Sequence, residues 1–339
     1  MAIYLKKNIA FRCEASTNNG YGHFMRCYAI AKALQKKYSY EVHFVINKNL
    51  YLNLFLRNKK IKITYIKEKI KSSHEEIILD KYLKKNKIDL LFLDIKKNYS
   101  FSFLRKIKKR LKIATIDDNK TKRLICDLCF YPPVPQIKKL NWKNFKGKKF
   151  IGWDFVPLRE EFQKKIILKK TNLKNITILC GGSNLNNFLK NILKKIESFK
   201  EKYNFYILAG FEDSAVTYSL KKTIHKIFFV KERKNIYKLV NKSSIIIAPY
   251  GITAYECAAL KKPTVLFARS KNDYISSSIF KKNKIASIFN NFENFNEELI
   301  TSVVKKSTKY KKKINSISMK LKKGSINISR ILNNEIKKK

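Results

Sequence analysis

The stretch FRCEASTNNGYGHFMRCYAIAKAL, residues 11–34, decides the fold that we expect for this chain. It starts as an apolar strand, breaks into a polar loop that contains Gly20, Gly22 and His23, and continues as a helix with apolar residues at helical spacing. Such a turn places backbone N–H groups and a positive helix end at the carboxyl edge of a sheet, where α/β proteins bind anionic ligands. His23 adds a side chain of the type that exchanges protons near neutral pH.

Short apolar runs alternate with longer amphipathic segments along the chain, which is the pattern of βα units around a mainly parallel sheet. We expect helices at residues 23–37, 72–85 and 101–110, the second opening with SSHEE like a capping box. The expected strands are residues 9–12, 42–46, 61–65, 89–94 and 113–117, followed by 175–180, 205–209, 226–230, 244–248, 264–268 and 286–289.

The two sets of strands are separated by the proline-rich YPPVP, a basic stretch at residues 138–149 and a polar run at 160–172. We therefore expect two Rossmann-like βα domains, residues 1–160 and 161–339, that face a central cleft. The Lys-rich end of the second domain, from about residue 297, is expected to be helical.

The formal net charge of +50 would ordinarily indicate nucleic acid or an anionic surface as a partner. Only ten of the 75 basic residues are Arg, however, and Lys is scattered through nearly every segment. This distribution favours a solvated surface. We expect no specific nucleic acid partner, and keep open a peripheral membrane contact through the basic surface.

The cysteines and the apolar segments indicate a cytoplasmic protein, and we expect it to be a monomer. No segment approaches the roughly 18–20 apolar residues of a membrane span, and the first residues lack the apolar core of a signal peptide. The six cysteines are expected to be reduced and buried. Cys126 and Cys129 form a single CxxC, which without a second pair or clustered His is weak support for a zinc or redox site.

Two motifs in the second half suit an anionic ligand. Gly181, Gly182 and Ser183 follow an apolar strand and precede a helix, so backbone amides there can approach a phosphate. In SSIIIAPYGITAYECAALKKPTVLF, residues 243–267, Gly251 opens a turn between a buried strand and a helix that carries Glu256. The carboxylate of Glu256 would suit a ribose diol, although an acidic residue near a helix start also complements the helix dipole.

These motifs resemble, in the same order along the chain, those of the family that contains the UDP-sugar hydrolase of pseudaminic acid biosynthesis and the spore-coat polysaccharide glycosyltransferase-like proteins. The resemblance covers about 250 residues. It rests on GYGHFMR at residues 20–26, Ile116-Asp117-Asp118, PLREEF at 157–162, Gly181-Gly182-Ser183, and Gly251-Ile252-Thr253-Ala254-Tyr255-Glu256 with Ala258, Ala259, Leu260 and Pro263.

The resemblance implies a GT-B fold that binds a UDP-sugar without a metal or other cofactor. It makes the first domain catalytic, with His23 as the general base that activates water to attack the anomeric carbon and release UDP. It makes the second domain the nucleotide-binding one. The residues it implies for substrate binding are Gly20, Gly22, Arg26, Gly181, Gly182, Ser183, Gly251, Ile252, Thr253 and Glu256, with Arg12, Asp94 and Asp118 in support.

Other polar residues fit structural roles better. His43 lies in an expected strand, His74 at a polar helix start and His225 in a Lys-rich loop. Asp117 and Asp118 could form a metal pair, but at a strand end they more often make loop hydrogen bonds. The sequence leaves open whether Arg12 and Glu14 pair with each other or touch a ligand.

Departures from the family's pattern bear on the substrate. The hydrolases carry a tyrosine shortly after the strand aspartate, where this chain reads Asp94-Ile95-Lys96-Lys97, and an Asn-Gln pair where it reads Asn272-Asp273. The leading interpretation is hydrolysis of a UDP-linked amino or deoxy sugar in surface-glycan or nonulosonic acid biosynthesis. The alternative is a glycosyltransferase that transfers the sugar to a glycan or lipid-linked acceptor. A non-catalytic basic binding protein is a third interpretation.

Overall fold

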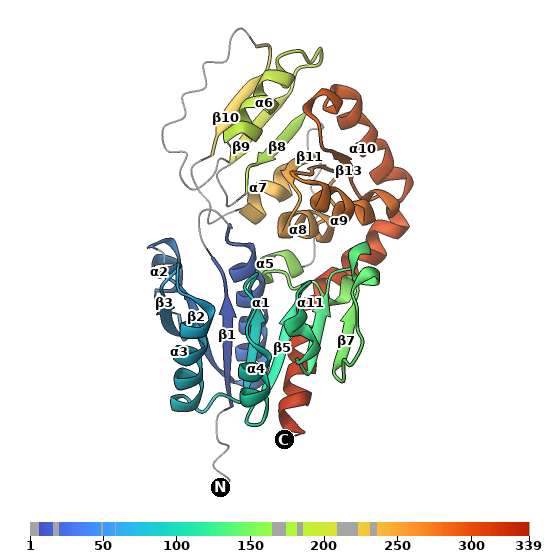
Figure 1. The fold of residues 1–339 in the computed structure, drawn as a ribbon. Coiled ribbons are helices and arrows are strands. Elements are labelled where there is room, and N and C mark those ends of the chain that lie inside the picture. Colours follow the sequence, from blue (N-terminus) through green and yellow to red (C-terminus); the bar gives the residue numbers. More distant parts are fainter. Residues whose placement is uncertain are drawn as a thin grey trace. The chain divides into compact units, whose positions relative to one another are not determined.

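A computed structural model describes residues 7–15, 20–48, 50–57, 59–164, 174–181, 186–208, 223–230 and 236–338 (Figure 1). By internal contacts the chain divides into two units. The first unit consists of Met1–Pro133, Ile137–Arg159 and Lys323–Lys339, and the second of Val134–Gln136 and Glu160–Lys322.

The first unit is built on a seven-stranded parallel sheet with the strand order β3-β2-β1-β4-β5-β6-β7. Its strands are β1 (Asn8–Cys13), β2 (Glu41–Asn47), β3 (Lys62–Ile66), β4 (Leu90–Asp94), β5 (Lys112–Ile116), β6 (Leu128–Tyr131) and β7 (Lys148–Ile151). Its helices are α1 (Gly22–Tyr38), α2 (Leu50–Leu56), α3 (Ser72–Lys85) and α4 (Phe101–Lys108), with 3₁₀ turns at Thr121–Leu124 and Trp153–Phe155.

Aromatic side chains form much of the core between β1 and α1. Phe11 stacks on Phe44 of β2 with ring centroids 5.3 Å apart, and Phe24 of α1 packs against Phe44 at the same distance. All three rings are fully buried. Since successive side chains of a strand point to opposite faces, Phe11 and Cys13 face α1 while Arg12 points to the other side of the sheet.

The second unit is built on a six-stranded parallel sheet with the order β10-β9-β8-β11-β12-β13. The strands are β8 (Asn175–Leu179), β9 (Asn204–Leu208), β10 (Lys226–Phe229), β11 (Ile245–Pro249), β12 (Thr264–Phe267) and β13 (Ser287–Phe289). Its helices are α5 (Glu160–Gln163), α6 (Asn186–Ile196), α7 (Ile236–Lys242), α8 (Ile252–Ala259), α9 (Lys271–Lys282) and α10 (Glu297–Lys309). A further 3₁₀ turn of this unit lies at Phe292–Asn294, and another, at Pro135–Lys139, starts in the second unit and ends in the first. One core cluster joins β8, β9 and α6 to β11, β13 and α10.

The last helix, α11 (Lys311–Lys337), belongs in part to each unit, because the division falls after Lys322. Within the first unit, its backbone passes so close to Val156 that a Cβ at Gly324 would overlap the carbonyl oxygen of Val156. Ser325 next to it donates from Oγ to the carbonyl oxygen of Leu158 at 2.8 Å. A helix interior ordinarily disfavours glycine, so this close approach explains why one stands here.

Each strand expected from the sequence is present, and the predicted α/β class with two parallel sheets is confirmed. Two further strands, β6 and β7, were missed. Both have only four residues, and β7 is a largely exposed edge strand that begins with Lys148 and Lys149, so it lacks the apolar run of a buried strand.

The capping box expected at SSHEE is wrong. The N-cap of α3 is Lys71, and no side chain caps this end of the helix. Glu75 instead turns into the unit and accepts a hydrogen bond from Arg12. In the ranges described above, no helix combines the length and the apolar character that crossing a membrane requires.

Candidate functional site

The carboxyl edge of the first sheet brings together the residues that the GYGH loop and the strand ends predicted. The strand order reverses between β1 and β4, because β2 and β3 lie on one side of β1 and the later strands on the other. Ligands of open α/β sheets bind where neighbouring strands reverse in this way. Asp94 is the last residue of β4, and His23 is the second residue of α1, the helix that follows β1.

His23, Arg26 and Asp94 form a hydrogen-bonded cluster at this reversal. His23 Nδ1 lies 2.6 Å from Asp94 Oδ1. Arg26 donates from Nε to Oδ2 and from Nη2 to Oδ1 of the same carboxylate, each at 2.5 Å. Its Nη1 donates to Asp117 Oδ2 at 3.1 Å. Because His23 and Arg26 are three residues apart on α1, one helix face presents both to Asp94.

The charge of Asp94 fixes the proton on His23. Burial would raise the pKa of this carboxyl, which is 1% exposed, but the positive charge of Arg26 and the contact with His23 prevail and hold the pKa well below its usual range. An ionised carboxylate only accepts hydrogen bonds, so the neutral His23 ring carries its proton on Nδ1. Nε2 is then left with a free lone pair, and the side chain is 22% exposed.

A second ion cluster lies on the other face of β1. Arg12 Nε donates to Glu75 Oε1 at 2.7 Å, and the hydroxyl of Tyr99 donates to the same oxygen at 2.5 Å. Lys97 Nζ donates to Glu75 Oε2 at 2.8 Å. Burial would raise the pKa of Glu75, but these partners lower it below its ordinary value. Arg12 therefore pairs with Glu75, and the possible ion pair between Arg12 and Glu14 does not form.

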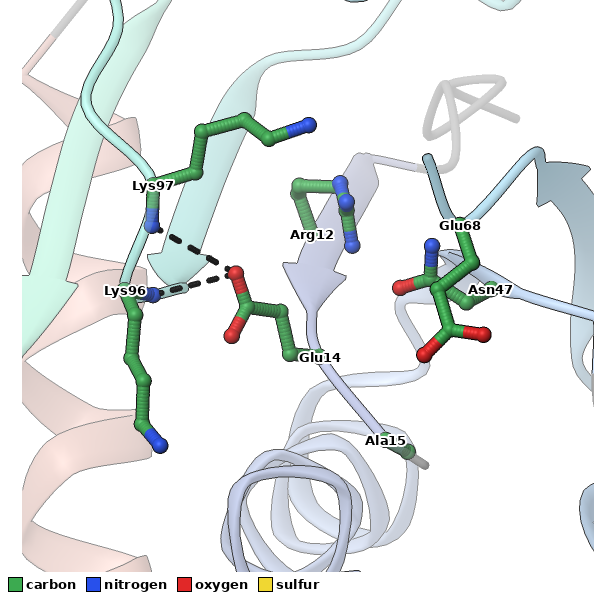
Figure 2. A pocket seen from close by; sticks show the side chains of 7 residues that line it. All are labelled: Arg12, Glu14, Ala15, Asn47, Glu68, Lys96 and Lys97. Carbon is green, nitrogen blue, oxygen red and sulfur yellow. Dashed lines mark hydrogen bonds between the residues drawn. The ribbon is translucent and has the colours of Figure 1, made fainter. Parts of the chain in front are cut away.

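A cavity of about 260 Å³ opens above this cluster at the carboxyl edge. Figure 2 shows Glu68 and Asn47 together on one side and Lys96 and Lys97 on the other, with Arg12 and Glu14 between them. Glu14 Oε1 accepts hydrogen bonds from the backbone N–H groups of Lys96 and Lys97, at 3.2 and 3.4 Å. Residues that follow β1, β2, β3 and β4 thus contribute to one cavity.

Asp117 and Asp118 have separate partners. Asp117 contacts Arg26, whereas Asp118 accepts from the buried Lys122 Nζ at 2.7 Å and from the backbone of Lys120 at 3.0 Å. In the part of the chain that the structure describes, no three His, Cys, Asp or Glu side chains are grouped to hold a metal ion. Asp118 thus makes the kind of loop hydrogen bond that we expected, whereas Asp117 pairs with a side chain of α1.

The other histidines and the CxxC lie apart from this site. His43 is buried beside Tyr82 and Glu41, and His225, which the sequence placed in a loop, is buried against the backbone of Ile196. Cys126 and Cys129 are free and buried.

The second sheet also reverses its strand order, between β8 and β11, and the two glycine motifs follow these two strands. Gly181 comes directly after β8 and has a φ of 78°, which favours glycine. Gly182 and Ser183 lie outside the described residues. Gly251 is the N-cap of α8, and Ile252 and Thr253 are the first two residues of that helix.

Gly251 and Glu256 differ in exposure. Neither backbone conformation nor packing requires glycine at position 251, since its φ of 166° is extended and no described atom lies within 4 Å of the position of a Cβ. Glu256 is the fifth residue of α8 and is 2% exposed. Glu256 therefore lies in the first turns of this helix, as we expected, and its side chain is buried within the unit.

Sequence reasoning missed Glu75, Asn47 and Glu68, and gave Lys97 and Tyr99 no role in a site. A usable signal existed for Glu75. It shares the apolar face of α3 with Leu79 and Leu83, at intervals of four residues, and all three are buried. An acidic residue on an apolar face predicts a buried basic partner.

Comparison with solved structures shows the fold. The chain is similar to MurG of Acinetobacter baumannii, with a TM-score of 0.63 and 13% identity over 97% of this chain and 99% of that one. A glycosyltransferase of Rickettsia africae has a TM-score of 0.64 and 12% identity over 97% and 99%. UDP-GlcNAc 2-epimerase of Neisseria meningitidis, solved with UDP-GlcNAc, has a TM-score of 0.60 and 13% identity over 98% and 100%. The two units are therefore Rossmann-like domains of the GT-B type.

Comparison of the amino-acid sequence with known proteins does not identify a family. No protein-family model matches the chain. An uncharacterized protein of Methanocaldococcus jannaschii is 26% identical over 283 residues, which are 78% of this chain and 56% of that protein. The match thus spans little more than half the length of this relative.

Proposed function

We propose that this protein is an enzyme that acts on a UDP-sugar, and that it hydrolyses a UDP-linked amino or deoxy sugar to release UDP. The observation that carries the proposal is the His23–Asp94–Arg26 cluster at the strand-order reversal of the first sheet. A histidine held by a buried carboxylate at a ligand-binding edge is arranged to act as a base.

In the proposed reaction, His23 Nε2 accepts a proton from water while the water oxygen bonds to the anomeric carbon. The bond from this carbon to the β-phosphate oxygen breaks, and its electron pair leaves with UDP. Asp94 holds the ring in the productive tautomer and stabilises the imidazolium that forms. Arg26 holds Asp94 through two hydrogen bonds, and is assigned with Gly20 and Gly22 to substrate binding. Gly20 has a φ of 73°, so the turn before α1 suits glycine.

The second unit is proposed to bind the nucleotide through Gly181, Gly182, Ser183 and Gly251 to Thr253. Two observations support this assignment. These motifs follow the two strands at which the second sheet reverses its order, and Gly251 has open space where another residue would carry a side chain. Glu256 is proposed to contact the ribose. The fold is also that of an epimerase solved with a UDP-sugar.

Transfer of the sugar to an acceptor is the second candidate. A glycosyltransferase of Rickettsia africae shares the fold over nearly the whole chain. In this reaction His23 would remove the proton of an acceptor hydroxyl, and the rest of the chemistry would be unchanged.

The test is release of UDP from a panel of UDP-sugars by the purified protein, with and without acceptors. Hydrolysis predicts release without an acceptor and a loss of roughly 10²- to 10⁴-fold in His23→Ala. His74→Ala is the matched control, because His74 is exposed on α3 outside the cluster. In water enriched in heavy oxygen, attack at the anomeric carbon places the label in the sugar, whereas attack at phosphorus places it in UDP.

The outcomes separate the two candidates. Strict dependence on an acceptor would exclude hydrolysis and support transfer. Release of UDP that survives in His23→Ala, or no release under either condition, would overturn the assignment of His23 and of the reaction.

A further inference from the structure

No residue that lines the cavity beside Glu14 takes a chemical step in the reaction proposed above, and the size of the cavity limits what it can hold. Its volume is about 260 Å³. Pockets that enclose drug-sized ligands measure roughly 300–1,000 Å³. The cavity therefore suits a single ring and is too small for a whole nucleotide-sugar.

The cations of the inner wall are held by internal hydrogen bonds. Arg12 and Lys97 both donate to Glu75, and Lys97 Nζ also donates to the carbonyl oxygen of Ile70 at 2.8 Å. Arg12 is 1% exposed and Glu75 fully buried. The two cations share one carboxylate, which leaves one net positive charge, and their hydrogen bonds to internal partners give the wall a fixed shape.

The remaining polar groups are mainly hydrogen-bond acceptors. Glu14 uses Oε1 to accept from the backbone of Lys96 and Lys97, and no described group donates to its Oε2. Glu68 is exposed at the rim. Lys96 is the third cation of the lining.

Asn47 presents an available amide to the cavity. It ends β2, lines the cavity, and is only 7% exposed. Within the described ranges, no backbone or side-chain group hydrogen-bonds to its amide. Neither amide atom of Asn47 is among the fully buried atoms without a partner, so the amide opens to the cavity, where a ligand that donates and accepts can bind it.

We propose that this cavity is a binding site for one uncharged, hydroxyl-bearing sugar ring, held by Asn47, Glu14 and Glu68. Hydroxyl groups donate to the carboxylates, and the amide of Asn47 can donate and accept in return. With Glu75 behind them, Glu14 and Glu68 balance the three cations Arg12, Lys96 and Lys97, so the cavity has no net positive charge that would favour phosphate. The inference rests on the proposed function only in assigning the ring to the UDP-sugar or to an acceptor.

The test is saturation-transfer NMR of the full chain with methyl glucoside and methyl N-acetylglucosaminide, with UDP and inorganic phosphate as competitors. We expect transfer to at least one glycoside that phosphate does not displace. Asn47→Leu keeps the volume but removes the hydrogen bonds, and should weaken glycoside binding at least about tenfold. Glu68→Gln should weaken glycoside binding several-fold. Because Glu68 is exposed, this variant is expected to fold and provides the test if Asn47→Leu does not fold. Glu201→Gln, the same charge change on the surface of the second unit, is the control.

The kinetics of UDP release show whether the sugar ring in the cavity belongs to the UDP-sugar or to the acceptor. A higher KM for the UDP-sugar without acceptor in Glu68→Gln places the donor sugar in the cavity, and a higher KM for the acceptor alone places the acceptor there. Glycoside binding that is absent in wild type, displaced by phosphate, or unchanged in both variants would overturn the proposal. Because glycoside binding is measured without turnover, failure of UDP release would overturn the proposed function alone.

Discussion

The tautomer of His23 depends on the negative charge of Asp94. Replacing the carboxylate by an amide removes this charge and keeps nearly the same side-chain shape. We predict that Asp94→Asn lowers UDP release by about 10²-fold or more, because an amide can present its N–H₂ group to Nδ1 and favour the wrong tautomer. It should also cost about 3–5 kcal/mol of stability, since Arg26 loses its buried partner. Rates corrected for the folded fraction, measured by circular dichroism, check the prediction.

Asp117→Asn is the control for this prediction. It removes the other carboxylate contact of Arg26, at 3.1 Å and with a side chain that is 40% exposed. We expect less than a tenfold effect on the rate, since surface ion pairs contribute roughly 0–1 kcal/mol. Equal losses in the two variants would show that Asp94 acts only through Arg26 and not on His23.

The position of His23 was predictable from the sequence, but its contact with Asp94 only in part. The GYGH motif predicts a strand–loop–helix turn, and this turn places His23 at the start of a helix. Asp94 was recognised as a residue at a strand end, yet its contact with His23 spans 71 positions of the chain. That contact exists because β4 pairs with β1, and strand order is a property of the folded sheet that apolar runs do not encode.

Elements were predictable where their residues are uniformly buried. β4 and β11 are buried along their whole length and read as apolar runs. The short β6 and the exposed edge strand β7 lack that signal. The prediction for the start of α3 was wrong because a glutamate at position 75 suits either a capping box or an ion pair with a buried arginine. The sequence does not show that Arg12 lies beside it.

The position of Gly324 in α11 yields a prediction for this helix. Alanine ordinarily stabilises a helix by about 1 kcal/mol relative to glycine. Here its Cβ would overlap the carbonyl oxygen of Val156, so Gly324→Ala should destabilise the protein by about 1–3 kcal/mol. Urea unfolding measures the change.

Ser316→Ala is the matched control for the helix, because Ser316 is exposed on α11. We expect its effect to stay within about 0.5 kcal/mol. A stabilising Gly324→Ala would contradict the close approach between α11 and Val156.

Across the whole molecule, the acidic groups that couple folding to pH are unevenly distributed. In the described ranges, carboxyls with a lowered pKa all lie in the first unit. They are Glu75, Asp80, Asp94 and Glu335, in which burial opposes the shift and basic partners prevail, and Glu41, which accepts a hydrogen bond from Lys62. A carboxyl with a lowered folded pKa stabilises the fold above its unfolded pKa, roughly 4, and this contribution is lost as the pH falls through the folded value.

We therefore predict that acid unfolds the first unit before the second. The two tryptophans, Trp142 and Trp153, both lie in the first unit, so their fluorescence reports on it alone. On acidification below about pH 4, the tryptophan signal should change before far-UV circular dichroism has lost the contribution of the second unit. Coincident transitions, or a tryptophan signal that outlasts the dichroism, would contradict the prediction.

The division of α11 also determines when each unit can fold during synthesis. The core of the first unit includes Ile328, Leu332 and Ile336, which are at most 1% exposed, although the rest of that unit ends at Arg159. At roughly 5–20 residues per second, the ribosome needs on the order of ten seconds or more to pass from the first stretch to the last. The unit that carries His23 therefore has its first stretch made before the second unit and Lys323–Lys339 made after it, and until then its nascent sheet exposes the apolar surface that α11 will cover.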